Sequence, residues 1–256
     1  MRGFAMPLQI VNPEAGYGRV ELADPAPSGY LHVGGHVRPR PPFMPMNRGK
    51  LELFRRLHRC AQRLRARGDV KRVSLFDALA MPPFARLPYV RDRRESVHLP
   101  RFDVAVLVET ASPEAAHEVR GSAPYHALRD ELATDADDTH ELLGRNARRI
   151  GDVERTRRGV YLFNHFVADD ADVALGLWDY LAAWYVRETG LTNSVLMVPE
   201  AGEKADYVAI NHAHWDEGLA KVMLRQLTSP GFGAFVRANL DANRVGAMPV
   251  LYRLVA

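Results

Sequence analysis

Apolar residues recur along this chain at two spacings, one typical of helices and one typical of strands. The helical spacing is clearest between residues 47 and 67, where Asn47 is a suitable N-cap and Gly68 a natural stop. The apolar residues of this stripe lie three or four positions apart: Leu51, Phe54, Leu57, Ala61 and Leu64. The opposite face is almost all arginine. The segment therefore predicts an amphipathic helix with one buried and one basic face.

Runs rich in β-branched and aromatic residues predict strands, and the order of strands and helices repeats. Strands are expected at residues 29–37, 70–80, 102–110, 149–153, 159–167, 193–198, 206–213 and 244–254. Helices are expected at residues 47–67, 112–132, 169–190 and 216–240, with restarts at Pro124 and Pro230. Each half of the chain therefore has the order β-α-β-β-α-β, which is that of a ferredoxin-like unit.

Two short anchors support a duplication. SAPYHALRDEL at 122–132 resembles SPGFGAFVRANL at 229–240, and the closing strands RIGDV and RVGAM follow in the same order. The expected domains are an irregular lead-in at 1–28, a first unit at 29–156 with a Pro/Arg-rich insertion at 81–100, and a second unit at 157–256.

The strands are apolar on both faces, which suggests how the two units pair. Tyr161 and Phe163 alternate with Leu162 and Phe166. One face of each sheet is covered by helices, and the other also has to be buried. We therefore predict an α+β fold in which the two antiparallel sheets pack into one intramolecular barrel, with a ligand space between them.

Composition indicates a cellular compartment and shows that charge is unevenly distributed along the chain. The single cysteine, Cys60, excludes an intrachain disulfide and fits a reducing compartment. The first residues make a poor signal peptide, and no apolar run approaches the roughly 20 residues of a membrane span. We expect a cytoplasmic protein with no membrane partner. Residues 38–101 carry 17 Lys+Arg against 5 Asp+Glu, although the whole chain has a net charge of only +3.

Polar residues within apolar strands are the candidates for chemistry. Asn164 and His165 lie in the middle of one strand, and Asn211 and His212 lie in another. A buried polar group costs about 1–3 kcal/mol if it is left unpaired, so these side chains are either bonded locally or face a polar cavity. Alternation places Asn164 and His165 on opposite faces, so one of them should point into the barrel. We take these four as the candidate catalytic residues.

Further residues are expected to line the ligand space. His212 and His214 share a face, but no third metal ligand is evident, so no metal is expected. In the first strand His32 and His36 share a face, with Gly34 leaving room between them, and Asn211 is expected on the face of Tyr207. The candidate substrate-binding residues are Tyr161, Phe163, Trp184, Tyr207, His214, Trp215, His32 and His36. Ordinary core packing is the alternative for each of them.

The segment INHAHWDEGLAKVMLRQLTSPGFGAFV, residues 210–236, resembles the dimeric α+β barrel superfamily, and within it the antibiotic-biosynthesis-monooxygenase-like proteins. The resemblance lies in a third strand, a Trp followed by an acidic residue, and a broken helix with a Ser-Pro-aromatic restart. It implies a ferredoxin-like fold and an oxygenase, a haem-dependent enzyme or a protein with no known activity. In family oxygenases that lack a cofactor, Asn and Trp near the pocket resemble groups that bind a substrate oxyanion.

Three functions follow from these observations. The first is a cofactor-independent monooxygenase-like enzyme that holds a small apolar or aromatic metabolite, with a histidine as the base. The second is a haem-binding or haem-dependent member of the same superfamily. The third is a non-catalytic binding protein that uses the basic helix 47–67. The strands lack the RNA-binding signature and the chain has no phosphate loop, which argues against a nucleic-acid partner. A homo-oligomer is left open.

Overall fold

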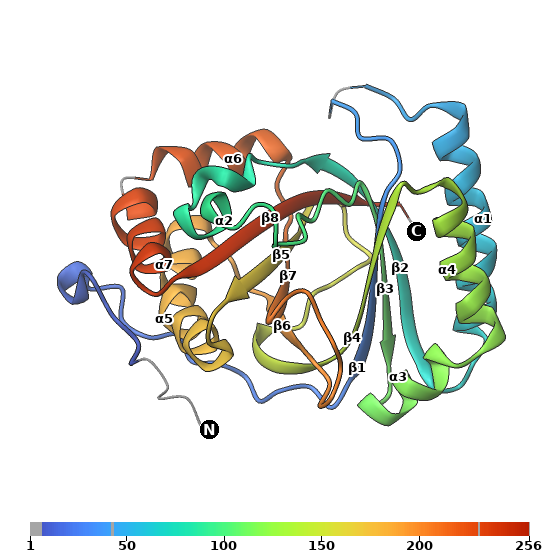
Figure 1. The fold of residues 1–256 in the computed structure, drawn as a ribbon, viewed down its shortest axis with the longest axis horizontal. Helices are drawn as coiled ribbons and strands as arrows, with labels where there is room; N and C mark the ends of the chain where they lie inside the picture. The colour runs from blue at the N-terminus through green and yellow to red at the C-terminus, as the bar shows by residue number, and fades with distance from the viewer. Residues whose placement is uncertain (1–6, 42–43, 230, 256) are drawn as a thin grey trace.

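Eight antiparallel strands close into a barrel in the computed structural model, which describes residues 7–41, 44–229 and 231–255 (Figure 1). The strands are β1 (Gly29–His36), β2 (Val70–Ala80), β3 (Val104–Thr110), β4 (Asp138–Gly151), β5 (Val160–Ala168), β6 (Ser194–Pro199), β7 (Ala209–Trp215) and β8 (Val245–Leu254). Their order around the barrel is β1-β3-β2-β8-β5-β7-β6-β4. The order β4-β1-β3-β2 in one half of the barrel matches β8-β5-β7-β6 in the other. The predicted α+β class agrees with this mixed fold and its closed barrel.

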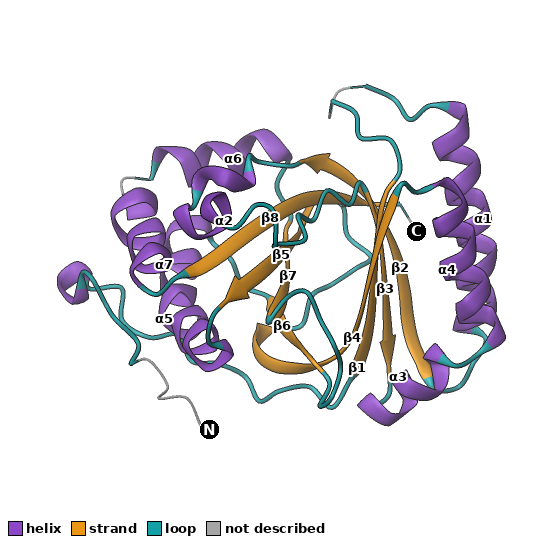
Figure 2. Cartoon of the chain, in the orientation of Figure 1, coloured by secondary structure: helices purple, strands orange, loops and turns teal. Residues whose placement is uncertain are grey.

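Helices cover the outside of the barrel in two layers (Figures 1 and 2). They are η1 (Pro13–Ala15), α1 (Arg48–Arg65), η2 (Phe84–Arg86), α2 (Pro88–Asp92), α3 (Pro113–Arg120), α4 (Ala123–Asp135), α5 (Ala171–Thr189), α6 (Leu219–Thr228), the π-helical turn η3 (Phe232–Arg237) and α7 (Ala238–Ala242). One layer, α1, α3 and α4, packs on the outer face of the first four strands. The other, built around α5, packs on the outer face of the last four.

Local sequence fixes the helix ends largely as expected. Asn47 caps α1 by accepting a hydrogen bond from the Lys50 amide, and Asp170 caps α5 in the same way. Gly190 ends α5 in the left-handed conformation, with φ of 68°, which a side chain would disfavour. The predicted apolar stripe of α1 is its buried face, except that Leu51 is exposed.

Three boundaries differ from the sequence-based expectation. The strand expected at 149–153 is wrong in extent, because β4 runs over fourteen residues and pairs with both β1 and β6. Its weak apolar pattern reflects positions such as Arg145 that stay exposed while alternate residues are buried. The strand expected at 206–213 is β7 at Ala209–Trp215. The helix expected to begin at residue 216 therefore begins later, at Leu219. The expected restart at Pro230 lies outside the described residues.

The segments expected to be irregular are held by the second helical layer. The insertion at 81–100 contains η2 and α2, and Tyr89 of α2 donates a hydrogen bond to Asp169 at 2.8 Å. In the lead-in, the amide of Gln9 donates to Asn243 at 2.8 Å. These contacts place both segments against the helices that cover the last four strands.

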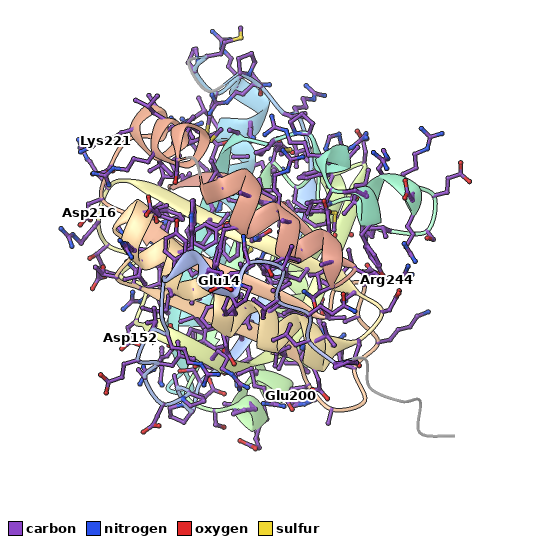
Figure 3. The ribbon with its side chains drawn as sticks, turned by 90° about the vertical axis from the view of Figure 1, so that its left-hand side faces the viewer. Glu14, Asp152, Glu200, Asp216, Lys221 and Arg244 are labelled. Atoms are coloured by element: carbon purple, nitrogen blue, oxygen red, sulfur yellow. The ribbon has the colours of Figure 1, made fainter. Side chains whose placement is uncertain are left out.

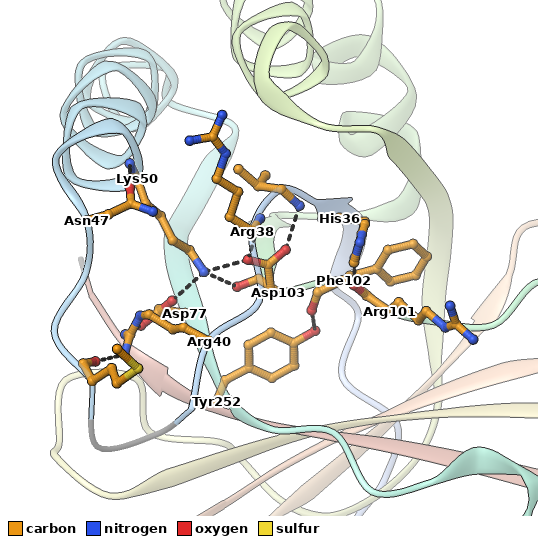
Figure 4. A network of polar contacts seen from close by, with 12 residues as sticks. His36, Arg38, Arg40, Asn47, Lys50, Asp77, Arg101, Phe102, Asp103 and Tyr252 are labelled. Carbon is orange, nitrogen blue, oxygen red and sulfur yellow. Dashed lines mark hydrogen bonds and ion pairs between the residues drawn. The ribbon is translucent and has the colours of Figure 1, made fainter.

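A buried ionic network joins the loop after β1 to both halves of the barrel (Figure 4). The Lys50 ammonium lies 2.8 Å from Asp77 and 2.7 Å from Asp103, and all three side chains are almost fully buried. Arg40 and Arg253 also pair with Asp77. Because Arg253 lies on β8 and Asp77 on β2, the network spans a junction between the two halves.

Candidate functional site

The pairing of β5 with β7 separates the four candidate catalytic residues into two pairs. Asn164 lies opposite Asn211, and Phe163 lies opposite His212. Directly opposed residues of an antiparallel pair point to the same face, and neighbours along a strand point to opposite faces. The two asparagines therefore face outward, toward α5, while His165 and His212 face the barrel interior.

An apolar pocket lies on the outer face, between the strands and α5. Its cavity volume is about 40 Å³. Its lining includes Leu162, Asn164, Phe166, Trp178, Asn211 and Trp215. An adjoining space of about 90 Å³ shares several of these residues and extends toward η2 and η3. Both volumes are below those of typical small-molecule sites, so lining side chains must move apart to admit an aromatic ligand. We call the two spaces together the outer pocket. Figure 3 views the helical layer from outside, with Lys221, Asp216 and Arg244 around its edge.

The amide of Asn211 is held in one orientation. Its oxygen accepts hydrogen bonds from the indole Nε1 of Trp178 at 3.2 Å and from the hydroxyl of Ser194 at 2.6 Å. An indole N–H can only donate, so the atom that faces it must be the amide oxygen. The amide NH2 of Asn211 makes no hydrogen bond with the described residues. Two N–H donors are therefore left for a ligand.

The neighbouring amide of Asn164 has no bonded partner. The residue is 9% exposed, and its buried oxygen makes no hydrogen bond within the described part of the chain. Leaving such a group unpaired costs about 1–3 kcal/mol. The unpaired oxygen of Asn164 in this apolar pocket therefore indicates a site where a ligand binds.

Aromatic rings occupy the barrel interior. The ring of His212 stacks on Phe163 with centroids 4.3 Å apart, and Phe76 lies 5.1 Å from Phe163. His32 lies 4.8 Å from Phe163 and 5.5 Å from His165. The space above Gly34, expected to be open, is taken by another ring, since a Cβ there would lie 2.5 Å from Phe102. The ligand space expected between the two sheets is thus occupied by side chains at these positions, and the pocket beside the asparagines lies outside the barrel.

The interior histidines are held neutral by burial. Desolvation lowers the pKa of His32 to about 3 and the pKa of His140 to about 4. Desolvation also lowers the pKa of His165 and of His212 well below the usual value. Both ring nitrogens of His32 and of His140 are buried without a hydrogen bond in the described residues. Weakly basic imidazoles on the far side of a sheet are poorly placed to serve the outer pocket as a base.

At the rim of the barrel, the pKa of His98 is shifted in the opposite direction. Burial lowers its pKa, but hydrogen bonds to Asp206 and Asp138 outweigh burial, and the net pKa is raised. The nitrogens of His98 lie 2.8 Å from Asp206 and 2.7 Å from Asp138.

The remaining candidate residues divide between several places. Trp215 lines the outer pocket and donates to Thr189 at 3.2 Å. Trp184 does not line it, and its ring packs on Tyr185 and Phe232. Tyr161, Phe163 and His214 face inward, where the ring of His214 lies 4.3 Å from that of Tyr161. His36 lies at the end of β1, where its Nδ1 is 2.7 Å from the carbonyl oxygen of Arg101.

The predicted face of Tyr207 is wrong. It was expected to share a face with Asn211, but its ring lies 4.8 Å from His165 and 4.7 Å from His140, inside the barrel. The reason is that Tyr207 precedes β7, which begins at Ala209, so strand alternation does not extend to it. Ser194 and Tyr185 of the pocket were missed, because a single polar residue at a strand start and a tyrosine on a helix carry no distinctive spacing.

The outer pocket does not fit haem. A haem iron takes an axial ligand such as His, Cys, Met or Tyr. Among the described lining residues there is no His or Cys, and the histidines of β5 and β7 lie on the opposite face. Burial raises the pKa of Tyr185 above its usual range, which keeps it a neutral phenol, and the one methionine, Met223, lies at the edge. The described residues also contain no group of three or more His, Cys, Asp or Glu that could hold a metal ion.

Several arginines of the basic helix form ion pairs with carboxylates of the same molecule. Arg56 pairs with Glu131 and Asp135 of α4, and Arg67 pairs with Asp69. In addition, Arg55 pairs with Glu52. This surface is therefore less free to bind an anionic partner than its sequence suggested. In the described chain, no helix combines the length and apolarity that crossing a membrane requires.

Comparison with models of known families and with curated proteins finds no match for the sequence. The fold, in contrast, matches solved structures. An anthrone oxidase-like protein superposes with a TM-score of 0.63 at 11% identity, over 92% of this chain and 94% of that one. A candidate monooxygenase from Fusobacterium nucleatum subsp. nucleatum gives 0.55 at 6% identity, over 90% and 94%. A dye-decolorizing peroxidase from Bacteroides thetaiotaomicron gives 0.51 at 10% identity, over 94% and 97%. The likeness shows a ferredoxin-like α+β barrel fold, as the resemblance implied.

Proposed function

We propose that this protein is a cofactor-independent oxygenase that binds a planar aromatic substrate in the outer pocket, beneath α5. The observation that carries the proposal is the pair of asparagine amides set in an apolar lining, with the NH2 of Asn211 aimed by Trp178. We further infer that the chain is a fused pair of ferredoxin-like units, supported by the matching strand order in its two halves.

The reaction must need no external reductant. An activated CH2 group flanked by aromatic rings meets this condition, because its oxidation by O2 is balanced as R2CH2 + O2 → R2C=O + H2O. The methylene carbon loses four electrons, one oxygen atom enters the new carbonyl, and the other leaves as water with the two protons of the methylene. The substrate first loses one of these protons to form an enolate-type anion, which can pass an electron to O2.

The residues of the pocket stabilise that anion rather than remove the proton. N–H donors fixed where negative charge develops stabilise it without reorganisation. Asn211 supplies two such donors, and Asn164 offers a second amide beside it. The apolar walls Leu162, Phe166 and Trp215 exclude water and strengthen these bonds. Since the described lining holds no carboxylate or imidazole, the proton passes to solvent.

The neighbours named above support an oxidoreductase. One is named as oxidase-like, one as a candidate monooxygenase and one as a peroxidase. The first of them also gives the highest of the three TM-scores, and its name points to an anthrone, a molecule with the required CH2 between aromatic rings. The haem alternative draws support from the peroxidase but not from the lining of the outer pocket, which lacks an imidazole ligand in its described part.

The test is oxidation of dihydroxyanthrone by purified protein freed of metal with a chelator. We expect O2 uptake equal to the dihydroxyanthraquinone formed. Asn211→Asp keeps an oxygen for Trp178 and Ser194 but removes both N–H donors and adds a negative charge. It should lower kcat by about 100-fold or more, the effect of losing one oxyanion donor.

The matched control is Asn193→Asp, directly before β6 and outside the lining, which should leave kcat within about twofold if folding is intact. Unchanged turnover in Asn211→Asp, or turnover in the parent protein that depends on added haem or metal, would reject the proposed function.

A further inference from the structure

A second cavity lies at one open end of the barrel and shares no lining residue with the outer pocket. Its cavity volume is about 230 Å³. It is formed where β1, β2 and β6 begin and where β3 and β4 end, and its lining includes Ser28, Tyr30, Lys71, Glu109, Arg155 and Val195. We call it the end cavity. Unlike the outer pocket, it is lined by several charged side chains.

Arg155 is a buried cation with hydrogen-bond donors to spare. Its side chain is only 5% exposed, and it pairs with Glu109 through Nη2. The Nε–H is buried without a partner, and Nη1 makes no hydrogen bond with any described residue. A guanidinium held in place with unused donors is a ready partner for an oxyanion, because its planar N–H groups match two oxygens at once.

The charges of the cavity leave one cation without a carboxylate. Ion pairs neutralise the other three cations of the lining: Arg155 with Glu109, Arg149 with Asp152 at 2.5 Å, and Arg72, at 3.5 Å, with Glu154, which lies outside the lining. The ammonium of Lys71 donates only to the hydroxyl of Ser28, at 3.0 Å. The site thus has an excess of one positive charge, which matches a monoanion better than a phosphate dianion.

We propose that the end cavity binds a small carboxylic acid, with its carboxylate between Arg155 and Lys71. The side chains of Val153 and Val195, also in the lining, offer apolar surface to the rest of the acid. The site does not depend on the outer pocket, and the outer pocket does not depend on it.

The experiment is calorimetric titration at fixed ionic strength with benzoate, with benzamide as its neutral isostere, and with inorganic phosphate. We expect benzoate to bind and benzamide to bind at least about tenfold more weakly, as loss of a hydrogen-bonded charge predicts. Failure of benzoate to bind, equal binding of benzamide, or tighter binding of phosphate would each overturn the proposal.

Single-residue variants test whether benzoate binds in the end cavity. Lys71→Gln changes an exposed side chain and should weaken benzoate binding by about fivefold or more, whereas Lys221→Gln, the same change on α6, should leave it unaltered. Arg155→Gln should abolish binding, with circular dichroism as the check on folding. Benzoate binding that survives Lys71→Gln unchanged, or that is lost in Asn211→Asp, belongs to another site and contradicts the assignment.

Discussion

The indole nitrogen of Trp178 lies 3.2 Å from the side-chain oxygen of Asn211, and this bond decides which end of the amide faces the outer pocket. The two residues come from α5 and β7, which are far apart in sequence and meet only through the packing of helix on sheet. Without the indole, Ser194 alone would hold the amide, and a hydroxyl accepts either orientation because it can donate or accept.

Trp178→Phe should therefore reduce both catalysis and stability. We expect the free energy of unfolding to fall by about 1 kcal/mol for the lost hydrogen bond. The kcat for dihydroxyanthrone should fall by about twofold, since the amide then spends about half of its time in the flipped orientation. Trp215→Phe is the control, because the Trp215 indole donates to Thr189 and not to a pocket amide. Equal loss of kcat in both variants would contradict the positioning role.

Asn164→Leu should not destabilise the folded protein. The Asn164 oxygen is buried and unpaired, so replacing the amide by an apolar group of similar size should leave the free energy of unfolding unchanged or raise it by about 1 kcal/mol. Asn146 is the matched control, because both ends of its amide are bonded, to Ala26, Arg148 and Leu196. Asn146→Leu should cost about 2–3 kcal/mol in urea unfolding. A comparable loss in Asn164→Leu would show that its amide has a structural partner.

The interior histidines should make the fold sensitive to acid. The pKa of His32 is about 3 and that of His140 about 4 in the folded protein, against about 6.5 when unfolded. Below pH 6.5 the unfolded chain binds protons that the folded chain does not. Stability is therefore complete above pH 6.5 and is lost as the pH falls toward the folded values. Each histidine contributes about 1.4 kcal/mol per pH unit in that window.

Urea unfolding at pH 7.5, 5.5 and 4.5 measures this slope. His98, which faces Asp138 and Asp206, has a raised pKa and contributes in the opposite sense. The comparison with His32→Phe isolates one residue, and the variant should lower the slope by about 1.4 kcal/mol per pH unit. An unchanged slope would mean that His32 is protonated in the folded state.

The buried network of Figure 4 should depend on Lys50. Lys50→Met leaves Asp77 and Asp103 short of a cation in the interior, and breaking a buried ion pair in this way costs about 3–5 kcal/mol. Arg55→Met removes an exposed pair from the same helix and should cost no more than about 1 kcal/mol. Similar losses in chemical denaturation of the two variants would contradict the buried network.

The strand order shows how far local pattern reaches. Apolar runs in the sequence predicted seven of the strands, because each of these strands is buried over most of its length. The long strand β4 was predicted only in part, since Arg145 is exposed and Arg148 only partly buried, and its stability comes from pairing with β1 and β6. Pairing between distant strands is a tertiary effect that no local window contains.

The site was predicted only in part for a related reason. Alternation correctly set Asn164 and His165 on opposite faces, but both faces of β5 are covered, one by α5 and one by the opposing strands. The sequence therefore could not say which of the two faces the pocket. Ser194 completes the arrangement around Asn211 and became visible only once β6 was placed beside β7.

The most direct test of the account is where an aromatic ligand binds. Leu162 lines the outer pocket, and Phe163, its neighbour, packs inside the barrel. Leu162→Trp should fill the outer pocket and abolish binding of dihydroxyanthraquinone, followed by its visible absorbance, in a variant whose folding is verified by circular dichroism. Phe163→Leu should leave the dissociation constant within about threefold. The opposite result, binding lost in Phe163→Leu and retained in Leu162→Trp, would place the ligand between the sheets and contradict the account.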